Sequence, residues 1–140
     1  MPECPELRHS RDVLRNVLIG KSIKSLLIPQ SGRYTKAPPH NFEKIINDLP
    51  LKVDSVDVKG KFMWWTLKGS NKTWYLWSTY GMSGQWSRLP GKHTAFVVEH
   101  DGGKLHFNDQ RRFGTIKFVC DQKEHDKKLK SYGAGSDSGA

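Results

Sequence analysis

The amino-terminal residues of this 140-residue chain offer its most distinctive chemistry. The chain begins Met1-Pro2-Glu3, and an initiator methionine is usually removed ahead of proline, which leaves Pro2 as a free secondary amine. An α-amino group titrates near pH ~7.7–8.0, so roughly a tenth of it is unprotonated at neutral pH. Such an amine can attack an aldehyde-like carbon and form an iminium ion, an electron sink that permits elimination on the adjoining carbon chain. The neighbouring Glu3 carboxylate can transfer the protons.

The same start has two alternative interpretations. Many proteins begin Met-Pro without using the proline in catalysis. In small-molecule tautomerases, an amino-terminal proline acts instead as a general base. Retention of Met1 would make the Pro2 nitrogen an amide that cannot attack, so the nucleophile interpretation requires a processed amino terminus.

The positive charge is concentrated in the first part of the chain. The sequence holds 23 Lys and Arg against 14 Asp and Glu, a formal net charge of +9. Residues 121–140 carry four basic and four acidic side chains, so the whole excess belongs to residues 1–120. A basic domain attracts polyanions, of which nucleic acid is the commonest, although a solvated basic surface without a specific partner is the alternative.

Several functional classes are disfavoured by composition. The sequence has no apolar run of membrane-spanning length, and carboxylates occupy the start where a signal peptide would be apolar, so we predict a nuclear or cytoplasmic protein that is not secreted. The only cysteines, Cys4 and Cys120, lack CxxC spacing, and the six histidines form no ligand-spaced cluster. We therefore expect no metal and no cofactor in this chain. We also expect a monomer.

Apolar spacing predicts two helices. The first runs from Pro5 to Gly20, and the second follows a cap at Asn41 and ends at Pro50. The first carries an apolar stripe of Leu7, Leu14, Val17 and Leu18, and the second a stripe of Phe42, Ile45, Ile46 and Leu49. Strands are predicted for residues 22–28, 51–58, 61–67, 72–80, 93–99, 104–107 and 115–119.

Short turns between consecutive strands favour antiparallel hairpins. The fold class that we predict is mainly β with two helices: an antiparallel β-sandwich of about eight strands flanked by an amino-terminal helix and a second short helix. The five tryptophans of the central strands are expected in the core. Residues 1–120 should form this domain, and residues 121–140 a charged, helical piece followed by a disordered Gly/Ser-rich tail.

Four motifs in register carry a family resemblance. MPECPEL at the start, KGKF at 59–62, GMSG at 81–84 and NDQRRFG at 108–114 together resemble the amino-terminal domain of the formamidopyrimidine-DNA glycosylase / endonuclease VIII family. The resemblance runs from Met1 to about Cys120. The amino-acid sequences of the segments between the motifs are most similar to those of the endonuclease VIII-like members of giant viruses.

The resemblance implies a bifunctional DNA glycosylase and apurinic-site lyase of base-excision repair, acting on damaged duplex or single-stranded DNA. By analogy, Pro2 attacks C1′ of an oxidised nucleotide, Glu3 assists ring opening and proton transfer, and Lys61 contacts the phosphate beside the lesion. The strand is then cleaved by β- or β,δ-elimination. Without the family, Lys61 would be an ordinary turn lysine.

An enzyme that attacks C1′ must take the nucleotide out of the stack, and inserted side chains must fill the space. Met82, Arg111 and Phe113 match the family's void-filling triad, while Arg112 suits the flanking phosphates. A solvated loop with a half-buried Phe113 is the alternative. The side chains for which the resemblance implies DNA contacts are Met82, Arg111, Phe113, Arg112, His93 and Arg33.

Some features depart from the family pattern. Cys4 stands where members more often have Gly or Leu, and Gln110 where many have Pro. Members also carry a helix–two-turn–helix module and usually a zinc or zincless finger after this domain. In residues 121–140, only a short stretch resembles the beginning of the helix–two-turn–helix module. We therefore expect a truncated domain with weak binding and slow turnover in isolation. A noncatalytic DNA-binding β-sandwich is the alternative function.

Overall fold

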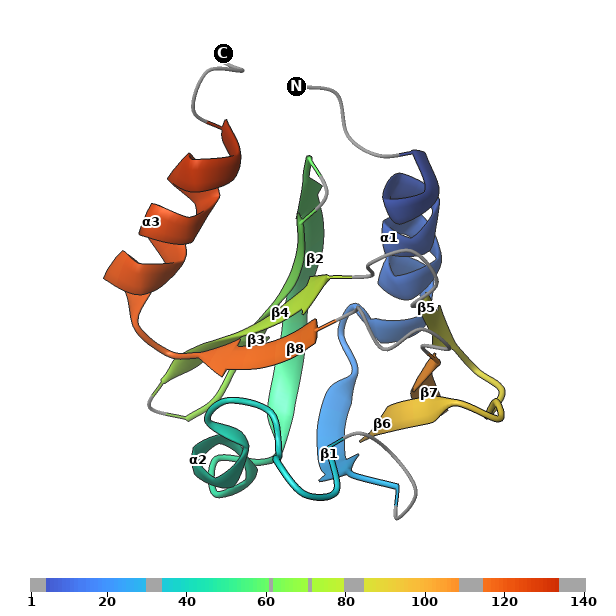
Figure 1. Ribbon diagram of the computed structural model, residues 1–140. Coiled ribbons are helices and arrows are strands. Elements are labelled where there is room, and N and C mark those ends of the chain that lie inside the picture. Colours follow the sequence, from blue (N-terminus) through green and yellow to red (C-terminus); the bar gives the residue numbers. More distant parts are fainter. Residues whose placement is uncertain are drawn as a thin grey trace.

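The structure, a computed structural model, describes residues 5–29, 34–60, 62–70, 72–79, 85–108 and 115–133. In chain order the elements are α1 (Pro5–Leu18), β1 (Ser22–Leu27), α2 (Phe42–Ile46), β2 (Leu51–Lys59), β3 (Phe62–Lys68), β4 (Thr73–Thr79), β5 (Gln85–Ser87), β6 (Thr94–His100), β7 (Gly103–Asn108), β8 (Thr115–Val119) and α3 (Gln122–Gly133). Figure 1 shows the two longer helices on opposite sides of the strands.

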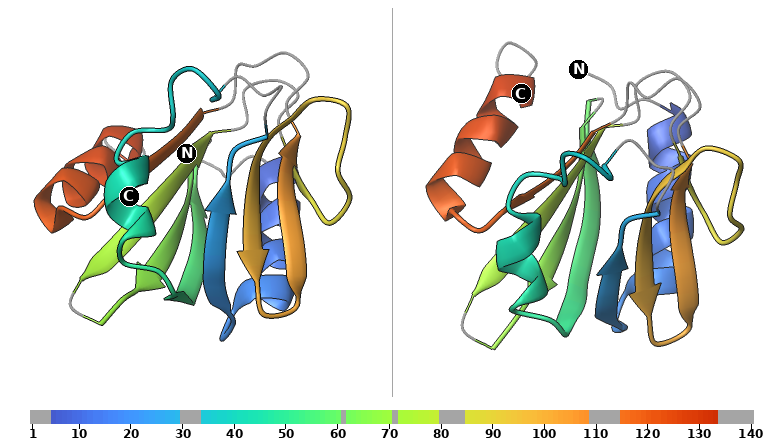
Figure 2. Two further views of the ribbon diagram at one scale, coloured as in Figure 1. Left: turned by 90° about the horizontal axis from the view of Figure 1, so that it is seen from below. Right: turned by 60° about the horizontal axis from the view of Figure 1, so that its bottom comes forward.

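The strands form one antiparallel sheet in the order β5-β7-β6-β1-β2-β3-β4-β8. The sheet folds over so that its two halves pack face to face, as the two views of Figure 2 show. Trp65 of β3 meets Trp86 of β5 with ring centroids 4.7 Å apart, and Phe96 of β6 meets Phe118 of β8 at 5.9 Å. The predicted antiparallel sandwich is confirmed.

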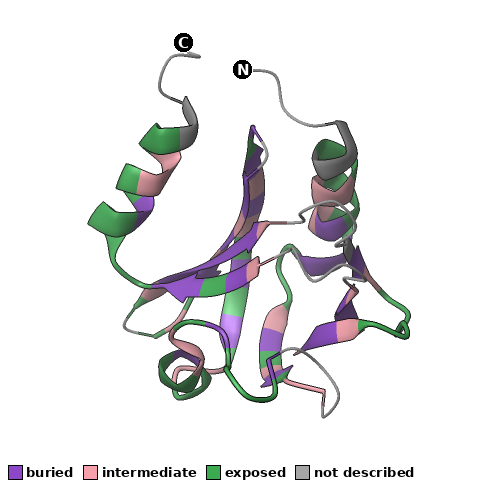
Figure 3. Ribbon diagram, in the orientation of Figure 1, coloured by how far each residue is buried: buried purple, intermediate pink, exposed green. Residues whose placement is uncertain are grey.

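The core lies between these two halves, and Figure 3 shows its buried residues concentrated in the strands. Four of the five tryptophans are buried and Trp64 is half-buried, so their predicted place in the core is confirmed. A second cluster of Phe62, Tyr75, Trp77 and Val119 has α3 against it through Leu129. No helix in the described part of the chain is long and apolar enough to cross a membrane.

α1 follows its predicted pattern. Leu14, Val17 and Leu18 are buried on one stripe, because residues three and four apart share a helix face. Gly20, with φ 83°, ends the helix in the left-handed conformation that glycine adopts without steric cost. The side chain of Leu7 lies outside the described residues.

The prediction for the second helix was wrong in two respects. Asn41 does not cap α2 through its side chain; it has φ 64°, and its amide donates to the Phe118 carbonyl of β8 at 2.8 Å. The side-chain donor is therefore used to hold this helix to the sheet. α2 also ends at Ile46, four residues before Pro50. Asp48 lies in the turn that follows and accepts the Trp74 indole N–H at 2.6 Å.

The seven predicted strands are present with ends shifted by no more than one residue, and β5 was missed. β5 has only three residues, too few to show a period, yet its Trp86 is 8% exposed and packs in the core. α3 provides the helical piece expected after Cys120, a third helix beside the two of the predicted fold class.

Candidate active site

α1 and β2 run in opposite directions, which brings the start of the helix and the end of the strand to the same end of the molecule (Figure 1). After the helix, the Gly20 N–H donates to the Val53 carbonyl at 3.2 Å. Closer to the helix start, Arg15 reaches Val56 and Asp57. Moving back along α1 therefore means moving forward along β2, toward Lys59.

The β2–β3 hairpin carries the predicted phosphate contact. Lys59 pairs with Phe62, so Gly60 and Lys61 alone connect the strands. Gly60 has φ 62°, the left-handed conformation that a two-residue hairpin turn requires at its first central position. Lys61 itself lies outside the described residues, as do Pro2 and Glu3 ahead of α1.

Two pairs of hydrogen-bonded strands, at opposite ends of the strand order, anchor the segments with the other predicted DNA contacts. Thr79 at the end of β4 pairs with Thr115 at the start of β8, and Gln85 at the start of β5 pairs with Asn108 at the end of β7. Segments 80–84 and 109–114 thus begin and end on strands that lie side by side. Their predicted contacts, all outside the described residues, are Met82, Arg111, Arg112 and Phe113.

The sheet register aligns these ends with the hairpin. Thr79 follows Ser78, the partner of Met63, so Thr79 lies level with Phe62 at the start of β3. Lys59, Phe62, Thr79 and Thr115 therefore form one row across β2, β3, β4 and β8. Three of the predicted motif segments leave the sheet along this row, which we call the motif edge.

Tyr34 connects a further segment to the motif edge. Its buried hydroxyl accepts a hydrogen bond from the Ile116 N–H at 3.0 Å, and its ring packs edge-on against Phe96. Tyr34 directly follows residues 30–33, which include the predicted contact Arg33 and lie outside the described residues. The end of that segment is thus fixed next to the start of β8.

His93 is the one predicted site residue within the described residues. It is exposed at the end of the β5–β6 connection. Thr94, the next residue, shares its hydroxyl with the Gly91 carbonyl at 3.0 Å and the Asn108 amide oxygen at 2.6 Å. The His93 backbone is therefore held close to Asn108, from which segment 109–114 begins.

The residues that brace this end of the molecule were not found from the sequence. Arg15, Tyr34, Thr79 and Thr115 act through partners 36 to 82 positions away, and nothing in their local spacing predicts those contacts. A tyrosine in an otherwise polar loop was the one available signal, because an aromatic ring in such a loop is often buried.

Two buried histidines have a lowered pKa. Burial lowers the pKa of His125, and the charge of Asp126 opposes this only in part. The His125 ring stacks on Tyr75 and accepts the Trp77 indole N–H at 3.0 Å, so the neutral ring holds α3 on the sheet. Burial also lowers the pKa of His100, in the β6–β7 hairpin.

A metal site is not found among the residues described: no three His, Cys, Asp or Glu side chains there lie close enough together to bind an ion. The chemistry that the site offers would come from the segments along the motif edge and from the amino terminus.

Comparison with known proteins identifies the family. Residues 1–116 match the model of the formamidopyrimidine-DNA glycosylase N-terminal domain, which is most of the chain. The chain belongs to this family. Among its relatives, the formamidopyrimidine-DNA glycosylase of Desulfitobacterium hafniense is 29% identical over 124 residues, covering 85% of this chain and 44% of that protein. The one from Exiguobacterium sibiricum is 31% identical over 126 residues, covering 84% and 42%.

Solved structures of family members share the fold. MutM (Fpg) from Thermus thermophilus superposes with a TM-score of 0.71 and 25% identity over 89% of this chain and 43% of that one. Lactococcus lactis Fpg, solved with DNA containing an abasic site, has a TM-score of 0.74 at 21% identity, covering 92% and 48%. This chain spans less than half the length of these relatives. Its predicted similarity to giant-virus members stays a prediction.

Proposed function

We propose that this chain is the catalytic domain of a bifunctional DNA glycosylase and apurinic-site lyase of base-excision repair, with damaged DNA as its substrate and oxidised bases as its targets. The motif edge is the observation that carries the proposal. The register of four strands lines up the ends of the segments that hold Lys61, Met82 and Arg111. Segments of one active site have to meet in this way, although they are far apart in the sequence.

In the proposed reaction, the nucleotide is rotated out of the stack and the Pro2 nitrogen attacks C1′. The C1′–N bond breaks and the base leaves with a proton. The proline nitrogen then loses its proton and its lone pair breaks the C1′–O4′ bond, O4′ takes up a proton, and an iminium ion joins Pro2 to C1′. Loss of a C2′ proton then expels the 3′ phosphate in β-elimination, and a second elimination would release the 5′ phosphate. Water finally hydrolyses the iminium ion and restores the free amine.

The remaining roles follow from charge and shape. Glu3 moves protons to and from the opening sugar, and Lys61 neutralises the phosphate beside the lesion. Met82, Arg111 and Phe113 fill the vacated stack, while Arg112, His93 and Arg33 contact DNA around it. The net charge of +9 supports attraction to a polyanion, and binding should weaken steeply with salt.

Borohydride trapping tests the proposal. Protein whose first residue is confirmed as Pro2 by intact mass is incubated with an oligonucleotide containing an abasic site or thymine glycol, and borohydride is added. We expect a covalent protein–DNA adduct that peptide mapping by mass spectrometry places on Pro2. The matched control is the same chain with Met1 retained, whose amide nitrogen cannot react. A gel shift without any adduct would refute catalysis and support a noncatalytic DNA-binding domain.

A further inference from the structure

The amino-terminal helix packs on the sheet through its carboxyl-terminal part. Among its described side chains, those of residues 8–18, the buried apolar ones are Leu14, Val17 and Leu18. Toward the other end, Arg8 and His9 are exposed. Apolar packing therefore fixes the carboxyl-terminal part of α1, and the direction in which the helix extends from there decides where its first residue lies.

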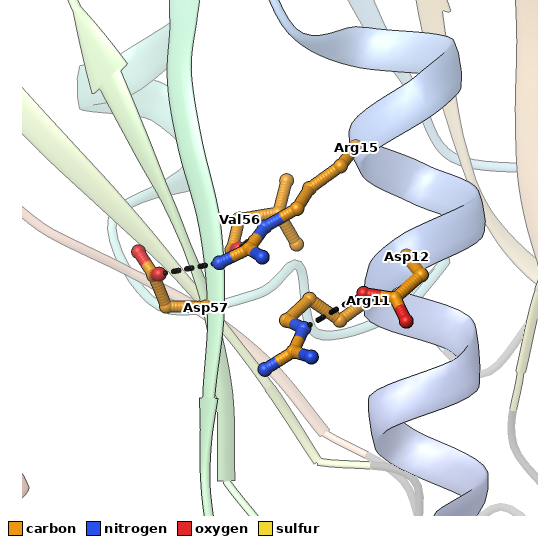
Figure 4. Close-up of polar contacts among 5 residues, drawn as sticks. All are labelled: Arg11, Asp12, Arg15, Val56 and Asp57. Carbon is orange, nitrogen blue, oxygen red and sulfur yellow. Dashed lines mark hydrogen bonds and ion pairs between the residues drawn. The ribbon is translucent and has the colours of Figure 1, made fainter.

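Arg15 adds a directional contact between α1 and β2. Its Nε donates to the Val56 carbonyl at 2.7 Å, and its Nη2 donates to Asp57 Oδ1 at 2.9 Å (Figure 4). A planar guanidinium that contacts two acceptors at once fixes orientation as well as distance. The Arg15 contacts and the hydrogen bond from the Gly20 N–H to the Val53 carbonyl therefore join this part of the chain to β2 at two points along the strand.

Arg15 contacts β2 beyond the point where β1 pairs with that strand. The pairing of β1 with β2 in this structure is at Ser22↔Lys52 and Ile23↔Leu51, near the start of β2. Farther along β2, α1 lies beside the strand instead, and Arg15 provides a donor to a backbone carbonyl there. The contact thus binds the helix to the stretch of β2 that leads into the Lys59–Phe62 hairpin.

We propose that Arg15 is a positioning residue for the reaction: by fixing α1 against β2, it sets the distance between the attacking amine of Pro2 and the hairpin that carries Lys61. This inference rests on the proposed function. Pro2 is three residues ahead of α1, and Lys61 is two residues after β2, so only a few residues separate each of them from the two elements that Arg15 joins.

The paths from the Arg15–Asp57 contact toward Pro2 and toward Lys61 run along α1 and along β2. Arg15 is about 15 Å along the helix from Pro5, and Asp57 is about 7 Å along the strand from Lys59. Attack requires the reacting atoms to be held near ~3–3.5 Å, and a displacement of about 1 Å can lower a rate by ~10²-fold. Loss of the Arg15 contacts should therefore slow formation of the Schiff base while leaving DNA affinity unchanged.

Single-turnover trapping separates this role from a structural one. Processed wild type, Arg15→Met and Arg15→Lys are each mixed in excess with abasic DNA, and adduct is quantified against time after borohydride quenching. Affinity is measured by titration with DNA containing a reduced abasic site. We expect Arg15→Met to lower the rate constant about tenfold, with final yield and affinity unchanged, and Arg15→Lys to restore only part of the rate, because one ammonium cannot replace the fork.

The matched control is Asp12→Asn. Asp12 accepts from Arg11 at 3.1 Å, an ion pair between consecutive residues of the same helix (Figure 4). We expect its rate constant to equal that of wild type. The inference is overturned if Arg15→Met reacts at the wild-type rate, if only its yield or affinity falls, or if Asp12→Asn slows the reaction equally. Absence of any adduct with wild type would overturn the proposed function, and this inference with it.

Discussion

Thr79 and Thr115 face each other across β4 and β8, with their hydroxyl oxygens 2.5 Å apart. Thr79 Oγ1 also accepts the Thr115 backbone N–H at 3.0 Å. One side chain thus joins the residue before segment 80–84 to the residue after segment 109–114. This contact therefore connects, at the motif edge, the two segments that carry the predicted void-filling side chains.

Thr79→Val tests this contact, since valine keeps the shape of the threonine side chain and removes its hydrogen-bond acceptor. We expect the free energy of unfolding to fall by about 1–2 kcal/mol, because a backbone N–H and a hydroxyl both lose a partner. Affinity for abasic DNA should fall as well. Urea denaturation and gel-shift titration measure the two effects. Thr73→Val, at the other end of β4, is the control; an equal loss of affinity there would contradict the assignment.

A buried hydrogen bond between β5 and β4 offers a second test. Trp86 Nε1 donates to Ser78 Oγ at 3.1 Å, and Ser78 is 0% exposed. Trp86→Phe should cost about 1–3 kcal/mol, since the hydroxyl is left buried without this donor. Adding Ser78→Ala should recover part of that loss. A double-mutant cycle by urea denaturation measures the coupling, and strictly additive effects would contradict it.

Local pattern predicted much of this fold because local spacing decides those elements. The stripe of Leu14, Val17 and Leu18 and the short turns between strands each reflect interactions within a few residues. Asn41 was misjudged because its amide has a nonlocal partner, the Phe118 carbonyl, that competes with helix capping. β5 was missed because its place depends on Trp86 meeting Trp65 of a distant strand.

In the candidate site, too, some features could be predicted from the sequence and others could not. Pro2 was identified from the chemistry of an amino-terminal secondary amine. Lys61 and the side chains of segments 80–84 and 109–114 were identified from motif resemblance, and residues 1–116 match the family model. The motif edge could not be predicted, because it needs the register of four strands. The Arg15–Asp57 pair spans 42 positions and depends on the offset of α1 along β2, which no local spacing encodes.

Acid should destabilise the protein through His125. Burial holds the pKa of His125 below its ordinary value of 6.5, so the folded state takes up its proton only at lower pH than the unfolded chain does. The stabilisation is complete above pH ~6.5 and is lost as the pH falls toward the folded pKa. His100, also buried with a lowered pKa, contributes in the same direction.

His125→Phe keeps a ring on Tyr75 but removes the acceptor for Trp77 and the titrating group. We expect it to cost about 1 kcal/mol at pH 7.5 and to weaken the loss of stability between pH 7.5 and 5.5. Urea denaturation at both pH values measures this. An unchanged dependence in His125→Phe would contradict the assignment.

Lys61 should contribute one phosphate contact, and the salt dependence of binding can count it. Each phosphate neutralised on duplex DNA adds about 0.9 to the slope of log affinity against log salt. Lys61→Met should therefore reduce that slope by about one. Lys68→Met is the matched control, because Lys68 is exposed on the same strand pair at the end opposite the hairpin. If both substitutions lower the slope equally, the effect belongs to net charge, and the phosphate contact of Lys61 is wrong.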